Sequence, residues 1–354
     1  MRGRRGARLL DAAAVVVGAV VLGLLLGLAG LPSPALFGGL VAGLVRALAV
    51  RVPDRLPEHA GTAGQAVIGV AMGALVDLGT LRAVAANWLP VLLVTVATLL
   101  LSLLAGAALR LHRGISPVTG AFAMIAGGAS GIVVMARELG ADARMVAVLQ
   151  YLRVLLIVLL MPVVAATAFG ATAGAGIVPD DPAAPGLLAG LAFTVACGVA
   201  GLVVGRLLRV PVAALLGPLV AAAVADLTGL SGGAEVPTLL EGAAFLVIGL
   251  QVGLSFTRDS LRTIGRALPL ALAITAALVL ACAGLGALLA AATGASALEG
   301  YLATTPGGLY AVLATARDVG ADVTFVLAVQ VLRLFVMLFS APLVARWLRR
   351  SHPR

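Results

Sequence analysis

The sequence predicts an all-α membrane protein made of two inverted repeats, each with five membrane crossings and one re-entrant hairpin. Three observations lead to this prediction. The chain is apolar along its whole length, its two halves carry the same charged motif, and arginine-rich loops alternate with arginine-free loops. Hydrophobic residues make up 62% of the 354 residues and charged residues only 11%, which excludes a soluble globular domain.

Twelve apolar segments follow one another, and many are long enough for a hydrocarbon layer of about 30 Å, which takes about 20 helical residues. In the first half they lie near 9–30, 34–50, 62–78, 87–110, 116–138 and 143–170. In the second half they lie near 186–208, 212–230, 238–256, 266–292, 297–316 and 322–348. The first segment is too long for a signal peptide and has no convincing cleavage site, so we expect a retained helix.

A motif of polar residues recurs 180 positions later. Ala136–Asp142 (ARELGAD) is followed by Gln150, Arg153 and Pro162, and the motif returns as Ala316–Asp322 (ARDVGAD), Gln330, Arg333 and Pro342. Charged residues are costly inside apolar helices, so their recurrence in one register indicates a duplication. The sequence predicts a first repeat over 1–170, a linker over 171–185 and a second repeat over 186–354.

The arginines set the orientation, because basic loops stay on the cytoplasmic side of a membrane. All 24 basic residues are arginines, and with the many Ala and Gly residues this predicts a high-GC bacterial genome and hence the inner membrane. If the N-terminus is inside, the arginine clusters near 46–55, 110–113, 206–209, 258–266 and 346–354 fall inside. The arginine-free stretches 171–185 and 231–237 then fall outside, and only Arg82 clearly departs from the bias. Both termini are therefore predicted to be cytoplasmic, with an odd number of crossings in each half.

An odd number requires one segment per half to enter the membrane and return on the same side. Segment 116–138 is interrupted by Gly127-Gly128-Ala129-Ser130-Gly131, and segment 297–316 by Thr304-Thr305-Pro306-Gly307-Gly308. Such breaks free backbone groups that lipid cannot satisfy, so they must be buried in protein or face water. The plan of about ten crossings and two glycine-broken hairpins, in opposite orientations, is common among secondary transporters.

The last helix of each half carries the best candidate site. Asp142, Gln150 and Arg153 lie within an arc of about 80° and so share a face, and Arg153 is about 16 Å along the helix from Asp142. Asp322, Gln330 and Arg333 repeat this pattern. Both arginines are thus expected near the membrane midplane, where they would bind an anionic or polar solute or hold a proton-exchanging carboxylate. Residues of the breaks would complete the site: Gly127, Gly128, Ser130, Thr304, Thr305, Gly307 and Gly308.

A structural alternative stays open for these arginines. Each could be paired with an acid of its own half, Asp142, Glu138, Asp322 or Asp318, and so fix the hairpin to the helix without any ligand. Arg137 with Glu138, and Arg317 with Asp318, are candidate charge pairs that could also act as a gate.

Other polar and small residues predict little chemistry. Glu241 and Glu299, near segment starts, are expected to cap helices or lie at the interface. The spaced glycines Gly69/Gly73 and Gly249/Gly253 are expected to allow close helix packing. Cys197 and Cys282 are expected to pack as small apolar residues, and no metal or cofactor site is predicted. We expect no enzyme activity and no direct nucleic-acid binding; the expected partners are the bilayer, a small solute and a coupling ion, and the sequence allows a homo-oligomer.

Gly-Ala-Asp followed by Gln and Arg on the last helix, present twice, resembles the AbrB-type membrane protein family. Its members carry this duplication and are often labelled an ammonia monooxygenase or a regulator of gene expression. The resemblance covers nearly the whole chain, with its specific part in Gly127–Arg153 and Gly307–Arg333, and the paired-glycine hairpins also look like those of ion-coupled carboxylate symporters. A monooxygenase would need a cluster of metal ligands, and a DNA-binding regulator a folded cytosolic surface; the sequence offers neither.

The favoured function is therefore a secondary transporter of a small polar or anionic solute, coupled to protons or another ion and working by alternating access. The alternative is a non-transporting membrane regulator or sensor that acts through a partner protein on the inside loops 51–59 and 256–266. An ammonia monooxygenase is the least favoured function.

Overall fold

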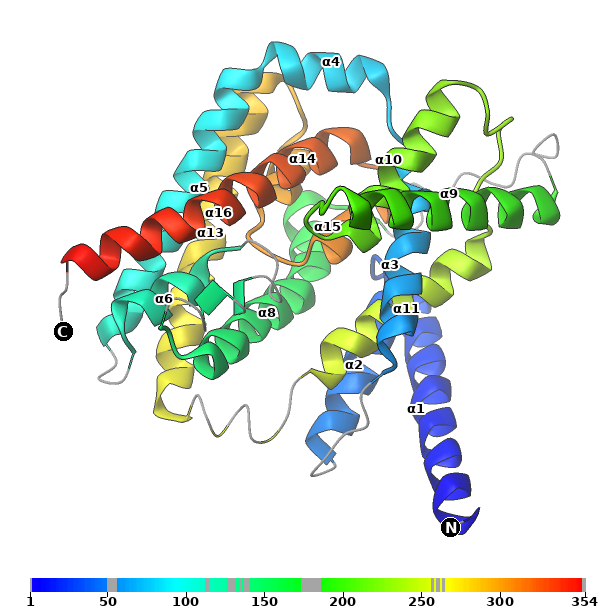
Figure 1. The fold of residues 1–354 in the computed structure, drawn as a ribbon, viewed down its shortest axis with the longest axis horizontal. Helices are drawn as coiled ribbons and strands as arrows, with labels where there is room; N and C mark the ends of the chain where they lie inside the picture. Colours follow the sequence, from blue (N-terminus) through cyan, green and yellow to red (C-terminus); the bar gives the residue numbers. More distant parts are fainter. Residues whose placement is uncertain are drawn as a thin grey trace. The chain divides into compact units, whose positions relative to one another are not determined.

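The chain is all-helical in the part that the structure describes (Figure 1). This computed structural model describes residues 2–49, 56–111, 115–126, 132–133, 135–136, 140–172, 186–255, 258, 262 and 265–351. The all-α prediction is therefore confirmed for these ranges.

The helices follow the predicted apolar segments closely. The elements of the first half are α1 (Arg2–Leu28), α2 (Pro34–Ala49), α3 (Glu58–Gly73), α4 (Leu78–Ala86), α5 (Trp88–Ala108), η1 (Leu109–Leu111), α6 (Pro117–Met124) and α8 (Ala143–Phe169). Those of the second half are α9 (Leu187–Leu207), α10 (Ala213–Leu227), α11 (Thr238–Leu254), η2 (Gly265–Ala267), α13 (Leu268–Thr293), α14 (Ala297–Thr304), α15 (Leu309–Asp318) and α16 (Val323–Ser351). The sequence analysis did not predict α4, because its apolar run is too short for a membrane crossing.

The predicted breaks have different outcomes in the two halves. In the second half α14 ends at Thr304 and α15 begins at Leu309, so the helix is interrupted at the predicted Thr-Thr-Pro-Gly-Gly stretch. Gly308 adopts a left-handed conformation with φ of 65°, which suits glycine. The first-half break, 127–131, lies outside the described residues.

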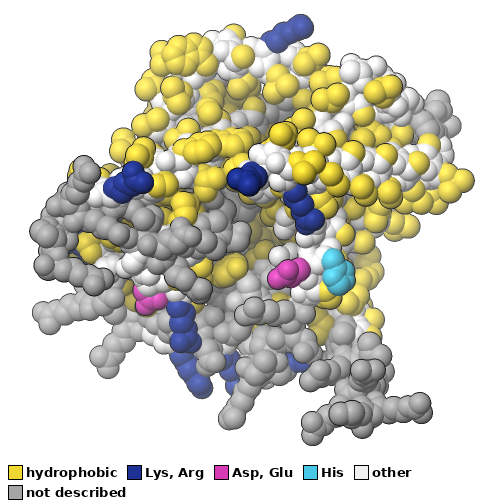
Figure 2. All heavy atoms as spheres, in the orientation of Figure 1, with side chains coloured by type: hydrophobic (Ala, Val, Ile, Leu, Met, Phe, Trp, Pro, Cys, Tyr) yellow, Lys and Arg dark blue, Asp and Glu magenta, His cyan; other side chains and the backbone are white. Residues whose placement is uncertain are grey.

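Five helices of the described chain are long and apolar enough to cross a membrane, or six if α3 and α4 form one broken span. Four more apolar helical stretches are shorter: residues 34–49, 213–227 and 238–254, and the part of α1 from Ala13 to Leu28. Large apolar side chains lie on the surface of these helices, such as Leu188, Val195 and Leu207 of α9, and apolar side chains cover most of the described surface in Figure 2. A soluble protein would bury such a surface, so these helices indicate a membrane protein.

The chain folds into two compact units, and each takes segments from both halves. One unit comprises Met1–Leu78, Pro162–Thr257 and Leu313–Val323, and the other comprises Gly79–Met161, Arg258–Val312 and Thr324–Arg354. We call the first the glycine-packed unit and the second the arginine unit, after the features described next. The sequence repeats are therefore interleaved in space rather than folded as separate bodies.

The glycine-packed unit pairs helices of one half with helices of the other. α2 packs along α11, and α3 packs along α10. At both contacts glycines bring backbones together: a Cβ on Gly249 would collide with Leu36 of α2, and one on Gly69 with Leu215 of α10. The expected role of these spaced glycines in close packing is confirmed.

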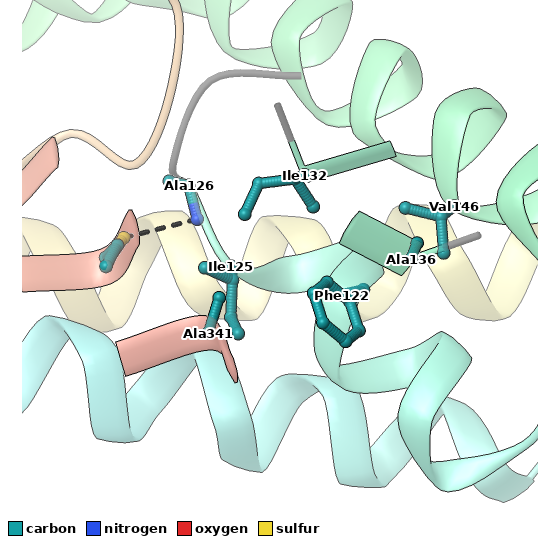
Figure 3. Packing of buried hydrophobic residues seen from close by; sticks show 8 residues of the cluster. Phe122, Ile125, Ala126, Ile132, Ala136, Val146 and Ala341 are labelled. Atoms are coloured by element: carbon teal, nitrogen blue, oxygen red, sulfur yellow. Dashed lines mark hydrogen bonds between the residues drawn. The ribbon is translucent and has the colours of Figure 1, made fainter. Parts of the chain in front are cut away.

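The arginine unit also contains repeated glycine contacts. A Cβ on Gly106 of α5 would lie 2.6 Å from the carbonyl oxygen of Gly120 in α6, and one on Gly286 of α13 would lie 2.5 Å from that of Gly300 in α14. Beside these helices a buried cluster forms a core around the C-terminal end of α6 (Figure 3). Its members are Phe122, Ile125, Ala126, Ile132, Ala136, Val146, Met337 and Ala341. The α16 residues in this list show that the last helix of the second half packs on first-half residues at and after the end of α6.

Candidate solute site

The predicted site residues on α8 and α16 lie in the arginine unit. Their side chains bond to backbone carbonyls at the C-terminal ends of α6 and α14. Gln150 and Arg153 are 1% and 2% exposed, and Gln330 and Arg333 are 1% and 4% exposed. Four polar side chains are thus fully buried inside an apolar chain. Burial on this scale requires hydrogen-bond partners, and these partners define what the site can do.

In the first half, Gln150 and Arg153 hold the C-terminal end of α6. The Gln150 amide donates to the carbonyl oxygens of Phe122, at 2.7 Å, and Ile125, at 2.8 Å. Arg153 donates through one terminal nitrogen to the carbonyl of Met124 and through the other to Oε1 of Gln150, at 2.5 and 2.6 Å. The guanidinium therefore satisfies carbonyls that the end of a helix leaves unpaired, and it lies at the negative end of the α6 dipole.

The second half repeats this arrangement at an offset of 180 residues. Gln330 donates to the carbonyls of Leu302, at 2.7 Å, and Thr305, at 3.3 Å. Arg333 donates to the carbonyl of Thr304 at 3.1 Å, to that of Thr305, and to Oε1 of Gln330. Two independent copies of one contact pattern show that both pairs have the same local task, which is to stabilise the end of a short helix before a break.

The threonines of the second break are used in the same network. The single proton of the Thr304 hydroxyl is shared between the carbonyls of Cys282, at 2.8 Å, and Gly300, at 2.9 Å, and the Thr305 hydroxyl donates to that of Tyr301 at 2.7 Å. Both side chains are 1% exposed. Their hydroxyl protons are therefore committed to backbone oxygens.

Each last helix also contacts the other half, α8 at the second-half break and α16 at Ala126 after the end of α6. A Cβ on Gly307 would lie 3.1 Å from Ile157 and 3.8 Å from Nε of Arg153. Conversely, the backbone N–H of Ala126 lies 3.2 Å from the sulfur of Met337, one turn beyond Arg333 (Figure 3). Arg153 thus lies between the end of α6, which it caps, and the residue pair Gly307-Gly308 that leads into α15.

The charge of this site is positive. Within the described ranges neither Arg153 nor Arg333 has a carboxylate partner, and the Nε–H groups of both are buried without any hydrogen-bond partner. The oxygens that they do contact belong to neutral amides. Next to Arg153, the first turn of α15 offers backbone N–H groups without intrahelical partners and the positive end of a helix dipole. Such an arrangement favours a negatively charged ligand.

Two of the four acids expected to pair with these arginines, Asp142 and Asp318, bond to backbone N–H groups instead. Asp142 accepts the N–H groups of Arg144 and Met145, both at 3.0 Å, and so caps the start of α8. Asp318 accepts the N–H of Ser33 at 2.8 Å, and Asp322 directly precedes α16. Gly127, Gly128, Ser130, Arg137 and Glu138 lie outside the described residues, so their predicted roles stay predictions.

A charge pair that the sequence analysis missed lies in the glycine-packed unit. Arg317 of α15 forms a salt bridge with Glu241 of α11, whose side chain is 8% exposed. Arg317 also lines a cavity of about 70 Å³, together with the side chains of Asp226 and Glu235. Glu241 was expected to cap its helix or lie at the interface; it is instead the partner of the candidate gate residue Arg317. The other expected cap is present, because Ser296 and Glu299 form a capping box at the start of α14.

Replacing Glu241 by Gln should destabilise the protein, because it removes one partner of a buried pair and leaves the Arg317 charge uncompensated. We expect the free energy of unfolding in detergent to fall by about 3 kcal/mol. The matched control is Glu235→Gln, which removes an exposed carboxylate from the cavity that Arg317 lines and should change stability by less than about 0.5 kcal/mol. Equal stability of the two variants would contradict the pairing.

No group of three or more His, Cys, Asp or Glu side chains comes together as a metal site in the described part of the chain. Cys197 and Cys282 are both buried and free, the first in the glycine-packed unit and the second in the arginine unit.

Comparison with known proteins supports the resemblance noted from the repeated motif. Residues 35–349 match the family described as "Transition state regulatory protein AbrB". The chain is 34% identical over 327 residues to "Putative regulator AbrB" of Escherichia coli (strain K12), with 92% of each chain covered. It is 26% identical over 303 residues to "Uncharacterized protein YhjN" of Bacillus subtilis (strain 168), which covers 82% of this chain and 78% of the relative.

Proposed function

The chain belongs to the AbrB family, and we propose that it is a secondary transporter of a small anionic solute in the bacterial inner membrane. The observation that carries this proposal is the pair of buried guanidiniums, Arg153 and Arg333, with unpartnered Nε–H groups and no carboxylate partner in the described chain. Two uncompensated charges in a low-dielectric region are costly, and a bound anion offsets that cost.

The Arg153 environment supports binding of the anion near Gly307. The Arg153 Nε lies 3.8 Å from where a Gly307 Cβ would be, so an anion bound by this Nε–H would lie next to the Gly307 backbone. The N–H groups of the first turn of α15 would donate to the same anion. In this arrangement the bound solute would supply the negative charge that a guanidinium loses when it is buried away from water and counter-ions.

The proposed topology has ten crossings, α1, α2, α3, α5, α8, α9, α10, α11, α13 and α16, with both termini in the cytoplasm. Helices of 15 to 17 residues, such as α10 and α11, are about 23–26 Å long, a mismatch that local thinning of the bilayer can accommodate. α14, with 8 residues, is about 12 Å long and reaches less than halfway across, as a re-entrant hairpin requires. In this proposal the two repeats are inverted, so the two breaks enter from opposite sides.

Alternating access would follow from the way the site is built. All the described residues of the anion site belong to the arginine unit, although they come from both halves of the chain. That unit can therefore expose its site to one side and then to the other without taking the site apart. Coupling to a proton or another ion would make the exchange directional.

The proposal is tested with the purified full-length chain. A thermal-shift screen against small carboxylates, inorganic oxyanions, amines and amino acids identifies binders, since a ligand of the folded state raises its stability. Uptake of the best binder into proteoliposomes is then measured under imposed pH, sodium and potential gradients. We expect stabilisation by anions alone and saturable flux of the best of them. Stabilisation by amines only, or anion binding without flux under any gradient, would contradict the proposal.

A membrane regulator without transport is the second candidate, because the family and the Escherichia coli relative are both described as regulatory. The inside loops expected to dock a partner, 51–59 and 256–266, lie largely outside the described residues. Co-purification of one protein that depends on the anion, in a chain that gives no flux, would favour this function over transport.

A further inference from the structure

Cys282 of α13 is hydrogen-bonded to the second-half break, which both guanidiniums of the arginine unit approach. The residue is 0% exposed. Its carbonyl accepts the Thr304 hydroxyl at 2.8 Å, and the Thr304 carbonyl in turn accepts a bond from Arg333 at 3.1 Å. Cys282 therefore belongs, through its backbone, to the same network as the second-half break.

The two guanidiniums approach the same short stretch of chain. Arg333 donates to the carbonyls of Thr304 and Thr305, and Nε of Arg153 lies 3.8 Å from the Cβ position of Gly307, although the two arginines come from different halves of the chain. Like charges repel in an interior of low dielectric constant, so two separate structural arginines gain nothing from this proximity. A shared ligand would offset this repulsion, because one anion can interact with both positive charges at once.

We propose that Arg153 and Arg333 serve one common anion site and that the Cys282 thiol lies in it. This deepens the proposed function, on which it rests, by replacing two half-sites with a single site at residues 304–307, which both arginines approach and to which Cys282 is bonded. The unpartnered Nε–H groups of both arginines are the donors left for that anion. A solute with two negative charges, such as a dicarboxylate or a divalent oxyanion, would balance the site, whereas a monovalent anion would leave one charge uncompensated.

The chain offers a direct test because Cys282 and Cys197 are its two cysteines. In the Cys197→Ala full-length protein, Cys282 is treated with an anionic methanethiosulfonate that carries a sulfonatoethyl group, or with a cationic one that carries a trimethylammonioethyl group. The thiolate attacks the reagent sulfur and forms a mixed disulfide, methanesulfinate leaves, and the thiol proton goes to the solvent. Rates are divided by those of each reagent with free 2-mercaptoethanol, so that only the effect of the site remains.

We expect the anionic reagent to modify Cys282 about tenfold faster or more than the cationic one, because two positive charges attract it in a region that contains little water. Arg153→Gln and Arg333→Gln should each reduce this preference by a factor of about three or more, while Arg153→Lys and Arg333→Lys should keep most of it. The lysine variants retain the charge but lose the planar hydrogen bonds, so they separate electrostatics from packing. The control thiol is Cys197 in the Cys282→Ser protein, which should show no charge preference.

Three results would overturn the inference: no charge preference at Cys282, dependence on only one of the two arginines, or no reaction of Cys282 in the folded protein. The flux assay separates this from the proposed function. Charge-selective labelling without flux keeps the anion site but removes transport, whereas flux without charge-selective labelling removes the common site but keeps transport.

Discussion

Arg153→Ala should abolish solute flux while the protein remains folded and inserted. An opposite charge at about 4 Å contributes about 4 kcal/mol at an effective dielectric constant of about 20, so loss of Arg153 should weaken anion binding at least about 100-fold. The measurement is the thermal shift produced by the best anionic binder, followed by flux in proteoliposomes. Arg333→Ala should behave in the same way, because its contacts repeat those of Arg153.

The matched control is Arg144→Ala on the same helix. Arg144 carries the same charge but is exposed in the first turn of α8, so its loss should leave anion binding and flux within about a factor of two. Size-exclusion profiles of both variants show whether the fold is kept, since Arg153→Ala leaves the Met124 carbonyl without its donor. Full flux by a folded Arg153→Ala protein would remove this residue from the site.

The sequence was sufficient to place the helices and the main polar residues. A period of 3.6 residues puts Gln150 and Arg153 on one face, and the recurrence of both at 330 and 333 marks them as a unit; the structure finds all four buried together at helix ends. The Thr-Thr-Pro-Gly-Gly stretch placed the second break correctly: Pro306 has no N–H to donate, and Gly308 adopts a left-handed φ of 65° that ends the regular helix geometry.

The sequence could not predict which elements each polar side chain contacts in the folded protein. Periodicity gives the face on which a side chain lies but not the element opposite it, so the bonds from Arg153 to backbone carbonyls rather than to acids could not be predicted. Glu241 corresponds to Gly61 in the first half, so the repeat gave no signal for its pairing with Arg317. For Cys282 a signal existed: the equivalent residue is Ser102, which is also buried and polar at the same place in the repeat.

The interleaving of the two halves was also not predicted. Apolar runs and loop charges describe one helix at a time, whereas the two units are set by contacts between helices far apart in sequence. The spaced glycines are the feature of the sequence that reflects those contacts. Their spacing suggested close packing, but the partner helix could be identified only from the structure.

Gly286→Ala should strongly disturb the arginine unit, whereas Gly284→Ala, two residues earlier on α13, should not. A methyl group on Gly286 would lie 2.5 Å from the Gly300 carbonyl and 2.6 Å from the Thr304 hydroxyl, while nothing lies within 4 Å of the same position on Gly284. Because the obstacle is backbone, α13 and α14 must separate, at a cost on the order of 2 kcal/mol or more. Gly284→Ala should leave stability unchanged or raise it slightly, since alanine favours helix by about 1 kcal/mol over glycine.

Gly286→Ala should also affect the solute site, because Thr304 contacts both Gly286 and the site residues. A displaced Thr304 carries with it the carbonyl that accepts the bond from Arg333 and the hydroxyl that donates to Cys282. Gly286→Ala should therefore lower both the melting temperature in detergent and the affinity for the anionic probe. Gly106→Ala should do so through the first half, where the carbonyl of Gly120 is the obstacle. If Gly286→Ala matches Gly284→Ala in both measurements, the close approach of α13 and α14 does not support the site.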